Sequence, residues 1–323
     1  MAALTYADIE AARGRISGLV RPVTLVQADP RTFEVPDSDG PAEIFLALEF
    51  MQHTGTFKAR GAQNFIQAHR QGGTLPDAGI TIASGGNAGL ACAWAAREQS
   101  IRATVFLPVD APRVKVERLR GYGADVRLVG SEYAEALSAC HDFAASTGAL
   151  ASHAYDHPLI AAGAGTLMEE IHAQIQDLDT VVVAVGGGGL FSGVATAAEH
   201  YGIRTVAVEP ENCRALNAAL EAGRPVDVTV DSTAADSLGA RRASAMAVFA
   251  AQGKRARSIL VSDIEIVRAR QALWDDRRLA VEHGAGTALA GLLSGAYRPE
   301  RGERVCIVLC GANTDPSDLV GPH

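Results

Sequence analysis

An α/β fold with mostly parallel sheets is predicted from two features of the sequence. Short apolar runs alternate with segments of helical periodicity, and glycine-rich turns follow several of the runs. Strands are expected at residues 81–83, 103–107, 126–129, 180–185, 205–208 and 305–309, and a strand-like run covers residues 44–50. Helices are expected near residues 87–99, 111–122, 131–146, 159–177, 190–201 and 212–222. This alternation is typical of βαβ units whose helices cover parallel sheets.

Two helix starts carry clear signals. Asp110 precedes Ala111 and Pro112, which predicts a helix with proline in its first turn. Ser262 and Glu265 have the spacing of a capping box that opens a helix over residues 263–277. No repeat, low-complexity segment or proline-rich linker divides the chain, so composition alone marks no domain boundary.

Composition narrows the class of protein. The chain has 323 residues, enough for one large domain or two modest ones with an ample core. Its net charge is -8 and no basic block occurs, which argues against nucleic acid as a partner. Five cysteines without a CxxC pair favour a reducing compartment over a disulfide framework. Cys306 and Cys310 are expected on one face of a strand, too far apart to share a metal.

Neither a signal peptide nor a membrane helix is expected. The first residues lack a basic region and a long apolar core. Residues 180–198 are uncharged, but five glycines among them favour strand, loop and helix over a membrane-spanning helix. We therefore expect no membrane partner.

Lys58 is the strongest candidate for chemistry. It lies among small and apolar neighbours just after the run at 44–50. Burial disfavours an ammonium ion and lowers its pKa, which suits an amine that acts as nucleophile or base. A single lysine in such a place is more often an ordinary lysine at a strand end.

Two glycine-rich loops are candidates for anion binding. Gly186, Gly187, Gly188 and Gly189 precede Leu190 between an expected strand and helix, where backbone N–H groups can surround a phosphate. The loop matches neither GxGxxG nor GxxxxGK[ST], so a dinucleotide or a nucleoside triphosphate is disfavoured. The loop at 84–89 can hold a carboxylate through N–H groups and the Ser84 hydroxyl. Each loop is also compatible with a plain structural turn.

Cys310 ends the last expected strand and is followed by Gly311, Ala312 and Asn313. Most such cysteines are buried structural thiols. Together, the four segments at 54–62, 84–89, 186–189 and 310–313 resemble, in this order, the pyridoxal-phosphate enzymes of fold type II (tryptophan synthase beta-like), above all the serine and threonine dehydratases and serine racemases. The resemblance extends from Ile9 to Asp315.

The resemblance implies two open α/β domains with mostly parallel sheets. The large domain would comprise residues 1–78 and 157–323, and a small domain would be inserted at residues 79–156. The implied cofactor is pyridoxal 5'-phosphate, held on Lys58 as a Schiff base. The residues implied to contact the cofactor are Phe57, Lys58, Asn87 (3-hydroxyl), Gly186, Gly187, Gly188, Gly189, Leu190 (phosphate) and Cys310 (pyridine nitrogen). Those implied to hold the substrate carboxylate are Ser84, Gly85, Asn87 and Ala88.

Several positions depart from the family pattern. Gly85 stands where serine racemases carry a second acid/base serine, Ala88 stands where many members have histidine, and His283 replaces a usual proline. Ala215 stands where some relatives have an aspartate that binds a divalent cation together with the glutamate matched by Glu209. We therefore expect no metal and interpret Glu209 as part of a surface ion pair.

Three further polar residues have weaker signals in the sequence. Glu282 matches a family glutamate without an assigned role. His153 and His157 are expected to serve as caps or surface residues.

The expected activity is that of a cytoplasmic, homodimeric lyase, a serine or threonine dehydratase of amino-acid metabolism. It would convert L-threonine or L-serine to 2-oxobutanoate or pyruvate and ammonia by β-elimination. The alternatives are an ammonia-lyase for another β-hydroxy amino acid such as 3-hydroxyaspartate, an amino-acid racemase, and a β-replacement enzyme. A non-catalytic α/β protein that binds a phosphorylated ligand is the alternative from a different class.

Overall fold

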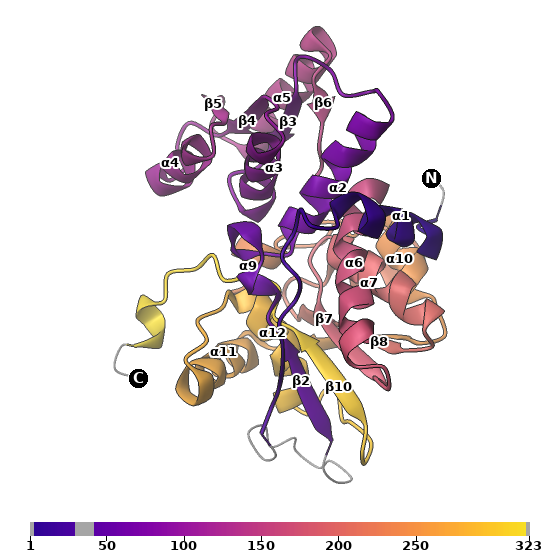
Figure 1. Cartoon of the computed structure of the whole chain (residues 1–323). Helices are drawn as coiled ribbons and strands as arrows, with labels where there is room; N and C mark the ends of the chain where they lie inside the picture. Colours follow the sequence, from indigo (N-terminus) through magenta and orange to yellow (C-terminus); the bar gives the residue numbers. More distant parts are fainter. Residues whose placement is uncertain (1–2, 30–41, 321–323) are drawn as a thin grey trace.

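Two separate sheets organise the chain in a computed structural model that describes residues 3–29 and 42–320 (Figure 1). The larger sheet has the strand order β1-β2-β10-β7-β8-β9. All its neighbouring strands are parallel except β1 and β2. Its strands are β1 (Leu25–Gln27), β2 (Glu43–Ala47), β7 (Thr180–Ala184), β8 (Arg204–Pro210), β9 (Ala256–Val261) and β10 (Arg304–Val308).

The smaller sheet is built from one continuous part of the chain and is parallel throughout, in the order β5-β4-β3-β6. Its strands are β3 (Ile80–Ala83), β4 (Ala103–Leu107), β5 (Asp125–Leu128) and β6 (Leu150–Ala151). The helices between them are α3 (Asn87–Glu98), α4 (Arg113–Gly121) and α5 (Tyr133–Thr147). The mixed and parallel sheets bear out the predicted α/β class.

The remaining helices accompany the larger sheet or join it to the smaller one. They are α1 (Tyr6–Ile16), α2 (Lys58–Gln71), α6 (Pro158–Gln174), α7 (Gly189–His200), α8 (Ala215–Ala222), α9 (Ala235–Leu238), α10 (Ala245–Ala251), α11 (Asp263–Arg277) and α12 (His283–Leu293). Short 3-10 turns cover Glu49–Met51, His53–Gly55 and Ser317–Leu319. Among the described residues, no helix is long and apolar enough to cross a membrane.

The central strands of the larger sheet are buried on both faces. Val181, Val182 and Ile307 have no exposed surface, as expected for parallel strands covered by helices. Helices α6 and α7 approach closely because both contain glycine at their contact. A Cβ atom on Gly193 would lie only 2.2 Å from the Ala161 carbonyl oxygen.

Element boundaries show where local pattern and tertiary contacts disagree. The run at 44–50 was expected to be extended to its end, but β2 stops at Ala47. A 3-10 turn follows because Glu49 turns inward to the buried Arg60 guanidinium, at 2.6 and 3.0 Å. The helix expected from the first turn around Pro112 starts at Arg113, with Pro112 as its N-cap. The Ser262 capping box and the helix at 263–277 are confirmed.

Glu209 was expected in a surface ion pair, and that expectation is wrong. The residue has no exposed surface, and its two carboxylate oxygens accept the N–H groups of Leu216 (2.7 Å) and Asn217 (2.8 Å) in the first turn of α8. Burial raises the pKa of Glu209 to about 8, and the two N–H donors act in the opposite direction. The carboxyl group therefore caps α8 from inside the protein.

Replacing Glu209 with alanine tests this cap. Glu209→Ala leaves two N–H groups near a buried helix start without an acceptor, which should lower the free energy of unfolding by about 1–3 kcal/mol. Urea unfolding followed by circular dichroism measures the change. Glu211→Ala, at the exposed residue that directly follows β8, is the matched control and should stay within about 0.5 kcal/mol of the parent. Equal effects of the two variants would contradict the role of Glu209.

Candidate active site

A cavity of about 340 Å³ lies where the loops after β3, β7 and β10 meet. Ligands of open α/β sheets bind beyond the carboxyl ends of the strands, and these loops are such ends. The expected site residues that line the cavity are Phe57, Lys58, Ser84, Asn87, Ala88, Gly186, Gly187, Gly188, Gly189, Leu190 and Cys310. Gly85 is the exception, because it lines only the neighbouring cavity.

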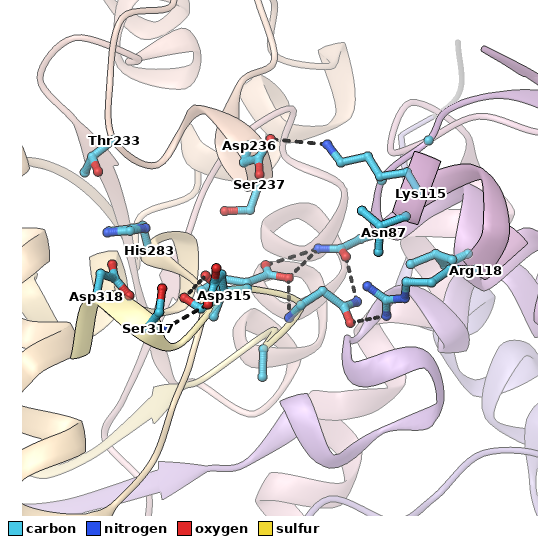
Figure 2. A pocket seen from close by; sticks show the side chains of 18 residues that line it. Asn87, Lys115, Arg118, Thr233, Asp236, Ser237, His283, Asp315, Ser317 and Asp318 are labelled. Atoms are coloured by element: carbon cyan, nitrogen blue, oxygen red, sulfur yellow. Dashed lines mark hydrogen bonds and ion pairs between the residues drawn. The ribbon is translucent and has the colours of Figure 1, made fainter. Parts of the chain in front are cut away.

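The neighbouring cavity measures about 1080 Å³ and shares lining residues with the first (Figure 2). The shared residues are Gly86, Asn87, Lys115, Asp236, Ser237 and Glu282. Lys115 of α4 and Asp236 of α9 face one another there at 3.6 Å. The two cavities thus adjoin.

Lys58 is the first residue of α2. Its Nζ donates a hydrogen bond to the Ala154 carbonyl oxygen at 2.7 Å and lies 4.8 Å from the centre of the Phe57 ring. Lys58 keeps some accessible surface because it lines the cavity. Burial lowers its pKa to about 8, while Cys310 and Glu282 act in the opposite direction. About a tenth of the amine is therefore neutral at pH 7, far more than for an exposed lysine, as expected from its neighbours in the sequence.

Arg60 fixes the first turn of α2 and was given no role by sequence reasoning. It has no exposed surface and pairs with Glu49 and with Glu170 of α6, the latter at 2.7 and 2.9 Å. Removing one partner of such a buried network leaves an uncompensated charge. The network ties the segment that carries Lys58 to the larger sheet. The one trace of this network in the local sequence is the arginine two residues after Lys58.

The tetraglycine loop has the properties of an anion site. In the described part of the chain, the N–H groups of residues 186–189 meet no acceptor. Gly188 has φ +91°, and a Cβ atom on Gly187 would lie 2.4 Å from the Tyr155 ring. Glycine is therefore required where the loop passes under Tyr155 and opens α7. Unpaired N–H groups at a helix start suit a phosphate.

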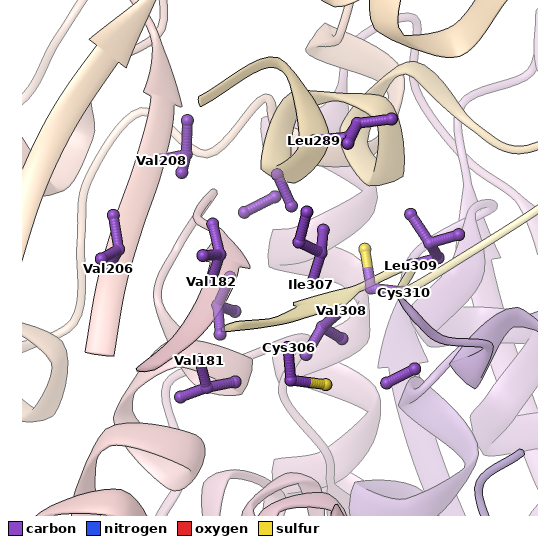
Figure 3. Packing of buried hydrophobic residues seen from close by; sticks show 14 of the residues in the cluster. Val181, Val182, Val206, Val208, Leu289, Cys306, Ile307, Val308, Leu309 and Cys310 are labelled. Carbon is purple, nitrogen blue, oxygen red and sulfur yellow. The ribbon is translucent and has the colours of Figure 1, made fainter. Parts of the chain in front are cut away.

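Cys310 lies in the cavity as a neutral thiol. Burial raises its pKa to about 12. Cys310 was expected to end the last strand, but β10 ends two residues earlier, at Val308. Figure 3 shows the sulfur atoms of Cys306 and Cys310 on opposite sides of β10, which corrects the prediction that they share a face. A thiol can meet a ring nitrogen without adding negative charge beside it.

Asn87 lies at the start of α3 with its amide held on two sides. Its Nδ2 donates to the Glu282 carboxylate at 2.8 and 3.1 Å, and its Oδ1 accepts from Asn313 Nδ2 at 2.8 Å. Burial raises the pKa of Glu282, and the N–H donors of Asn87 and Asn313 lower it. Sequence comparison singled out Glu282 without a role. The structure places it in the cavity.

His153 and His157 have structural roles, whereas Tyr155 lines the cavity although nothing in the sequence indicated this. His157 Nδ1 accepts the Leu159 N–H at the start of α6, and His153 Nδ1 accepts the N–H groups of Tyr155 and Asp156, so both act as caps, as expected. Tyr155 lines the cavity and donates to the Arg242 carbonyl oxygen at 3.1 Å. No sequence signal pointed to it, because its partners are distant in the chain.

The donor groups of the cavity indicate what kind of ligand it can hold. Within the described ranges, no group of three or more histidine, cysteine or acidic side chains can hold a metal. The donors that do converge, an amine of lowered pKa and a cradle of N–H groups, fit a phosphorylated aldehyde instead. A lysine amine beside a phosphate-binding loop is typical of α/β enzymes that carry a phosphorylated aldehyde cofactor on a lysine.

A family model described as pyridoxal-phosphate dependent enzyme matches residues 16–311. The chain therefore belongs to the family of pyridoxal-phosphate dependent enzymes. The resemblance to fold type II members and the pyridoxal-phosphate cofactor are thereby confirmed at the level of the family.

Individual relatives extend over most of the chain. The human protein named serine dehydratase-like is 36% identical over 282 residues, covering 84% of this chain and 85% of that protein. L-threonine ammonia-lyase of Geobacter sulfurreducens is 34% identical over 274 residues, covering 84% and 67%. The crystal structure of serine racemase from Dictyostelium discoideum superposes with a TM-score of 0.87 at 27% identity, covering 97% of this chain and 100% of that one.

The lowered pKa of Lys58 predicts its reactivity. Only the neutral amine reacts with trace acetic anhydride, so labelling of Lys58 in the cofactor-free protein should rise through about pH 8 and then level off. A reference lysine peptide in the same tube should continue to rise toward about pH 10.4. Mass spectrometry of the digested protein measures the labelled fraction at each pH. A Lys58 profile that follows the reference peptide would show that the amine is not buried as described.

Proposed function

We propose that this protein is a pyridoxal-phosphate-dependent ammonia-lyase that acts on a small β-hydroxy amino acid, L-serine or L-threonine. The products would be ammonia and pyruvate or 2-oxobutanoate. The observation that carries the proposal is the single poised amine of Lys58, combined with glycine at position 85, where a second acid/base group would be needed for racemisation. The names of the human and Geobacter relatives support it.

Each part of the cavity has a proposed task. Lys58 would carry the cofactor and then take the proton from the substrate Cα, since its pKa of about 8 leaves part of the free amine neutral at that pH. The tetraglycine loop and Leu190 would hold the phosphate, Asn87 the 3-hydroxyl, and Phe57 would pack near the ring. Pyridoxal phosphate supplies the electron-withdrawing ring system that makes the Cα proton acidic.

The loop at 84–89 would hold the substrate carboxylate. Among the described residues, the N–H groups of residues 85–88 meet no acceptor, so they are available together with the Ser84 hydroxyl. The loop must be tight, because a Cβ atom on Gly89 would lie 1.8 Å from the Ser84 carbonyl oxygen. Ala88, in place of a larger side chain, leaves room beside the cavity.

The neutral thiol of Cys310 bears on the choice of reaction. With its pKa raised to about 12, it places no negative charge at the expected ring position. The ring is then a weaker electron sink than one paired with a carboxylate. β-Elimination tolerates this, because departure of the hydroxyl group relieves the charge that develops at Cα.

The surroundings of the site support the wider assignment. We propose that residues 79–156, which include every strand of the smaller sheet, form the small domain, and that residues 1–78 and 157–323 form the large one. We also propose a cytoplasmic homodimer. All five cysteines are free and buried, consistent with a reducing compartment.

A panel of β-hydroxy amino acids tests the proposal directly. The holoenzyme should release 2-oxo acid from L-serine or L-threonine, and Lys58→Ala should release none while it unfolds like the parent. A preference for 3-hydroxyaspartate would change the substrate but keep the reaction. D-Serine formed as fast as pyruvate would make the protein a racemase and overturn the lyase assignment.

Position 85 predicts how the reaction can be redirected. Its backbone is not in the left-handed region, so the obstacle to a side chain is Leu107, whose Cδ2 would lie 2.8 Å from a Cβ atom. Gly85→Ser combined with Leu107→Val should therefore raise the ratio of D-serine to pyruvate, and Gly85→Ser alone should raise it less. Leu107→Val alone is the control. An unchanged ratio in the double variant would show that residue 85 does not face the reacting carbon.

Independence from divalent cations is a further expected result. The Glu209 carboxylate is occupied by two N–H donors, and Ala215 offers no second carboxylate. Removal of magnesium and calcium with a chelator should leave activity within about twofold of the untreated enzyme. A large loss that added cation reverses would reveal a cation site elsewhere.

A further inference from the structure

A chain of hydrogen bonds leads from the surface of α4 to Asn87, which lines both cavities (Figure 2). Arg118 Nη2 donates to Asn313 Oδ1 at 2.6 Å, and Asn313 Nδ2 donates to Asn87 Oδ1 at 2.8 Å. Arg118 and Asn87 belong to the part of the chain that forms the smaller sheet, whereas Asn313 follows β10 of the larger sheet. The chain of bonds therefore crosses twice between the two structural units.

The side-chain amide and the backbone N–H of Asn313 all have partners. Its Nδ2 also donates to the Thr54 carbonyl oxygen at 2.7 Å, and its backbone N–H donates to Glu282 Oε1 at 2.9 Å. This side-chain amide has one orientation. A flip would set its nitrogen against the Arg118 donor, and its oxygen against the acceptor oxygens of Thr54 and Asn87. Asn313 is thus a fixed reference point beside the cavity.

The turn that meets Asn313 is held in a costly conformation. Thr54 has φ 62°, a left-handed value rare for a β-branched residue, and its buried hydroxyl has no partner. Gly55 follows with φ +78°, and a Cβ atom there would lie 3.0 Å from Asn313 Oδ1. This backbone directs the Thr54 carbonyl oxygen at Asn313. The bond between them therefore belongs to a conformation that the surrounding structure enforces.

The same bonds determine how Asn87 can act. Its Oδ1 is taken by Asn313, and one N–H of its Nδ2 is directed at the Glu282 carboxylate. A flipped Asn87 amide would bring its oxygen against Glu282 and its nitrogen against Asn313 Nδ2. One N–H of Asn87 remains for a ligand, and Asn87 lines the cavity.

We propose that Asn313 and Arg118 are positioning residues for Asn87: they hold its remaining N–H toward the 3-oxygen of the cofactor, and Arg118 makes that alignment depend on α4 lying against the segment after β10. The inference rests on the proposed function only for the place of pyridoxal phosphate in the cavity. Loss of the contact between α4 and Asn313 would loosen the donor, so the alignment of Asn87 depends on how the two structural units lie against each other.

A hydrogen bond to the 3-oxygen favours its anionic form, which absorbs visible light, over the neutral form, which absorbs in the near ultraviolet. The ratio of the two bands is therefore a direct readout of the Asn87 donor. It needs no turnover, and a change in overall stability alone does not move it. The dissociation constant of pyridoxal phosphate is a second readout.

The experiment compares Asn313→Ala, Arg118→Ala, Arg118→Lys and the double alanine variant, loaded with pyridoxal phosphate. Asn313→Ala should shift absorbance toward the near ultraviolet and weaken cofactor binding roughly tenfold, the effect of losing one hydrogen bond to a charged group. Arg118→Ala should give a smaller shift of the same sign, because Arg118 is exposed and acts through Asn313. Arg118→Lys should recover part of it. Arg120→Ala, at an exposed residue of the same helix, is the control and should change neither readout.

The double variant separates coupling from independent effects. If Arg118 acts through Asn313, Arg118→Ala should add nothing in the Asn313→Ala background. Additive shifts would overturn the role of Arg118, and an unchanged spectrum in Asn313→Ala would overturn the whole inference. If Asn313→Ala does not fold, the surface variant Arg118→Ala decides alone, since an unchanged spectrum there contradicts the coupling. Parent protein that binds no pyridoxal phosphate would refute this inference and the proposed function together, whereas normal elimination with unchanged variants refutes only the inference.

Discussion

The enclosure of the Lys58 amine is the constraint on which the rest of the site depends. Its Nζ is held 2.7 Å from the Ala154 carbonyl oxygen and 4.8 Å from the Phe57 ring centre, and burial brings its pKa to about 8. An exposed lysine would remain an ammonium ion near neutral pH. The buried position thus converts an ordinary side chain into a usable nucleophile and base.

Holding that amine in place requires a rigid start of α2. Arg60, two residues further on, is locked between Glu49 and Glu170. Buried ion networks contribute little net stability, but they define one geometry, because any displacement leaves a charge unpaired. The amine then faces groups supplied by both structural units, Asn87 and Ala154 from one, and Glu282 and Cys310 from the other. The site is therefore sensitive to how the two units lie against each other.

Local sequence was sufficient for features whose causes are local. The capping box of Ser262 and Glu265, the glycine loop that opens α7 and the apolar neighbours of Lys58 all act within a few residues, and the structure shows each as expected. The α/β class also follows from alternating patterns along the chain.

Features that depend on distant partners were predicted poorly. Glu209 was expected at the surface because nothing beside it reveals that the start of α8 folds back over it. β2 ends early because Glu49 meets Arg60, and the place of Tyr155 over Gly187 arises only when segments far apart in sequence come together. Asn313 was recognised as part of a motif, but its contact with Arg118 joins residues 195 positions apart. Such contacts are properties of the tertiary structure, not of the local pattern.

The measurement that tests the account most directly locates the cofactor on the chain. The sequence contains three lysines, Lys58, Lys115 and Lys254. Reduction of the purified holoenzyme with borohydride followed by mass spectrometry of its peptides assigns the pyridoxyl group to one of them. The account predicts stoichiometric modification of Lys58 alone. Modification of Lys115 or Lys254 instead, or of no lysine in protein saturated with pyridoxal phosphate, would contradict it.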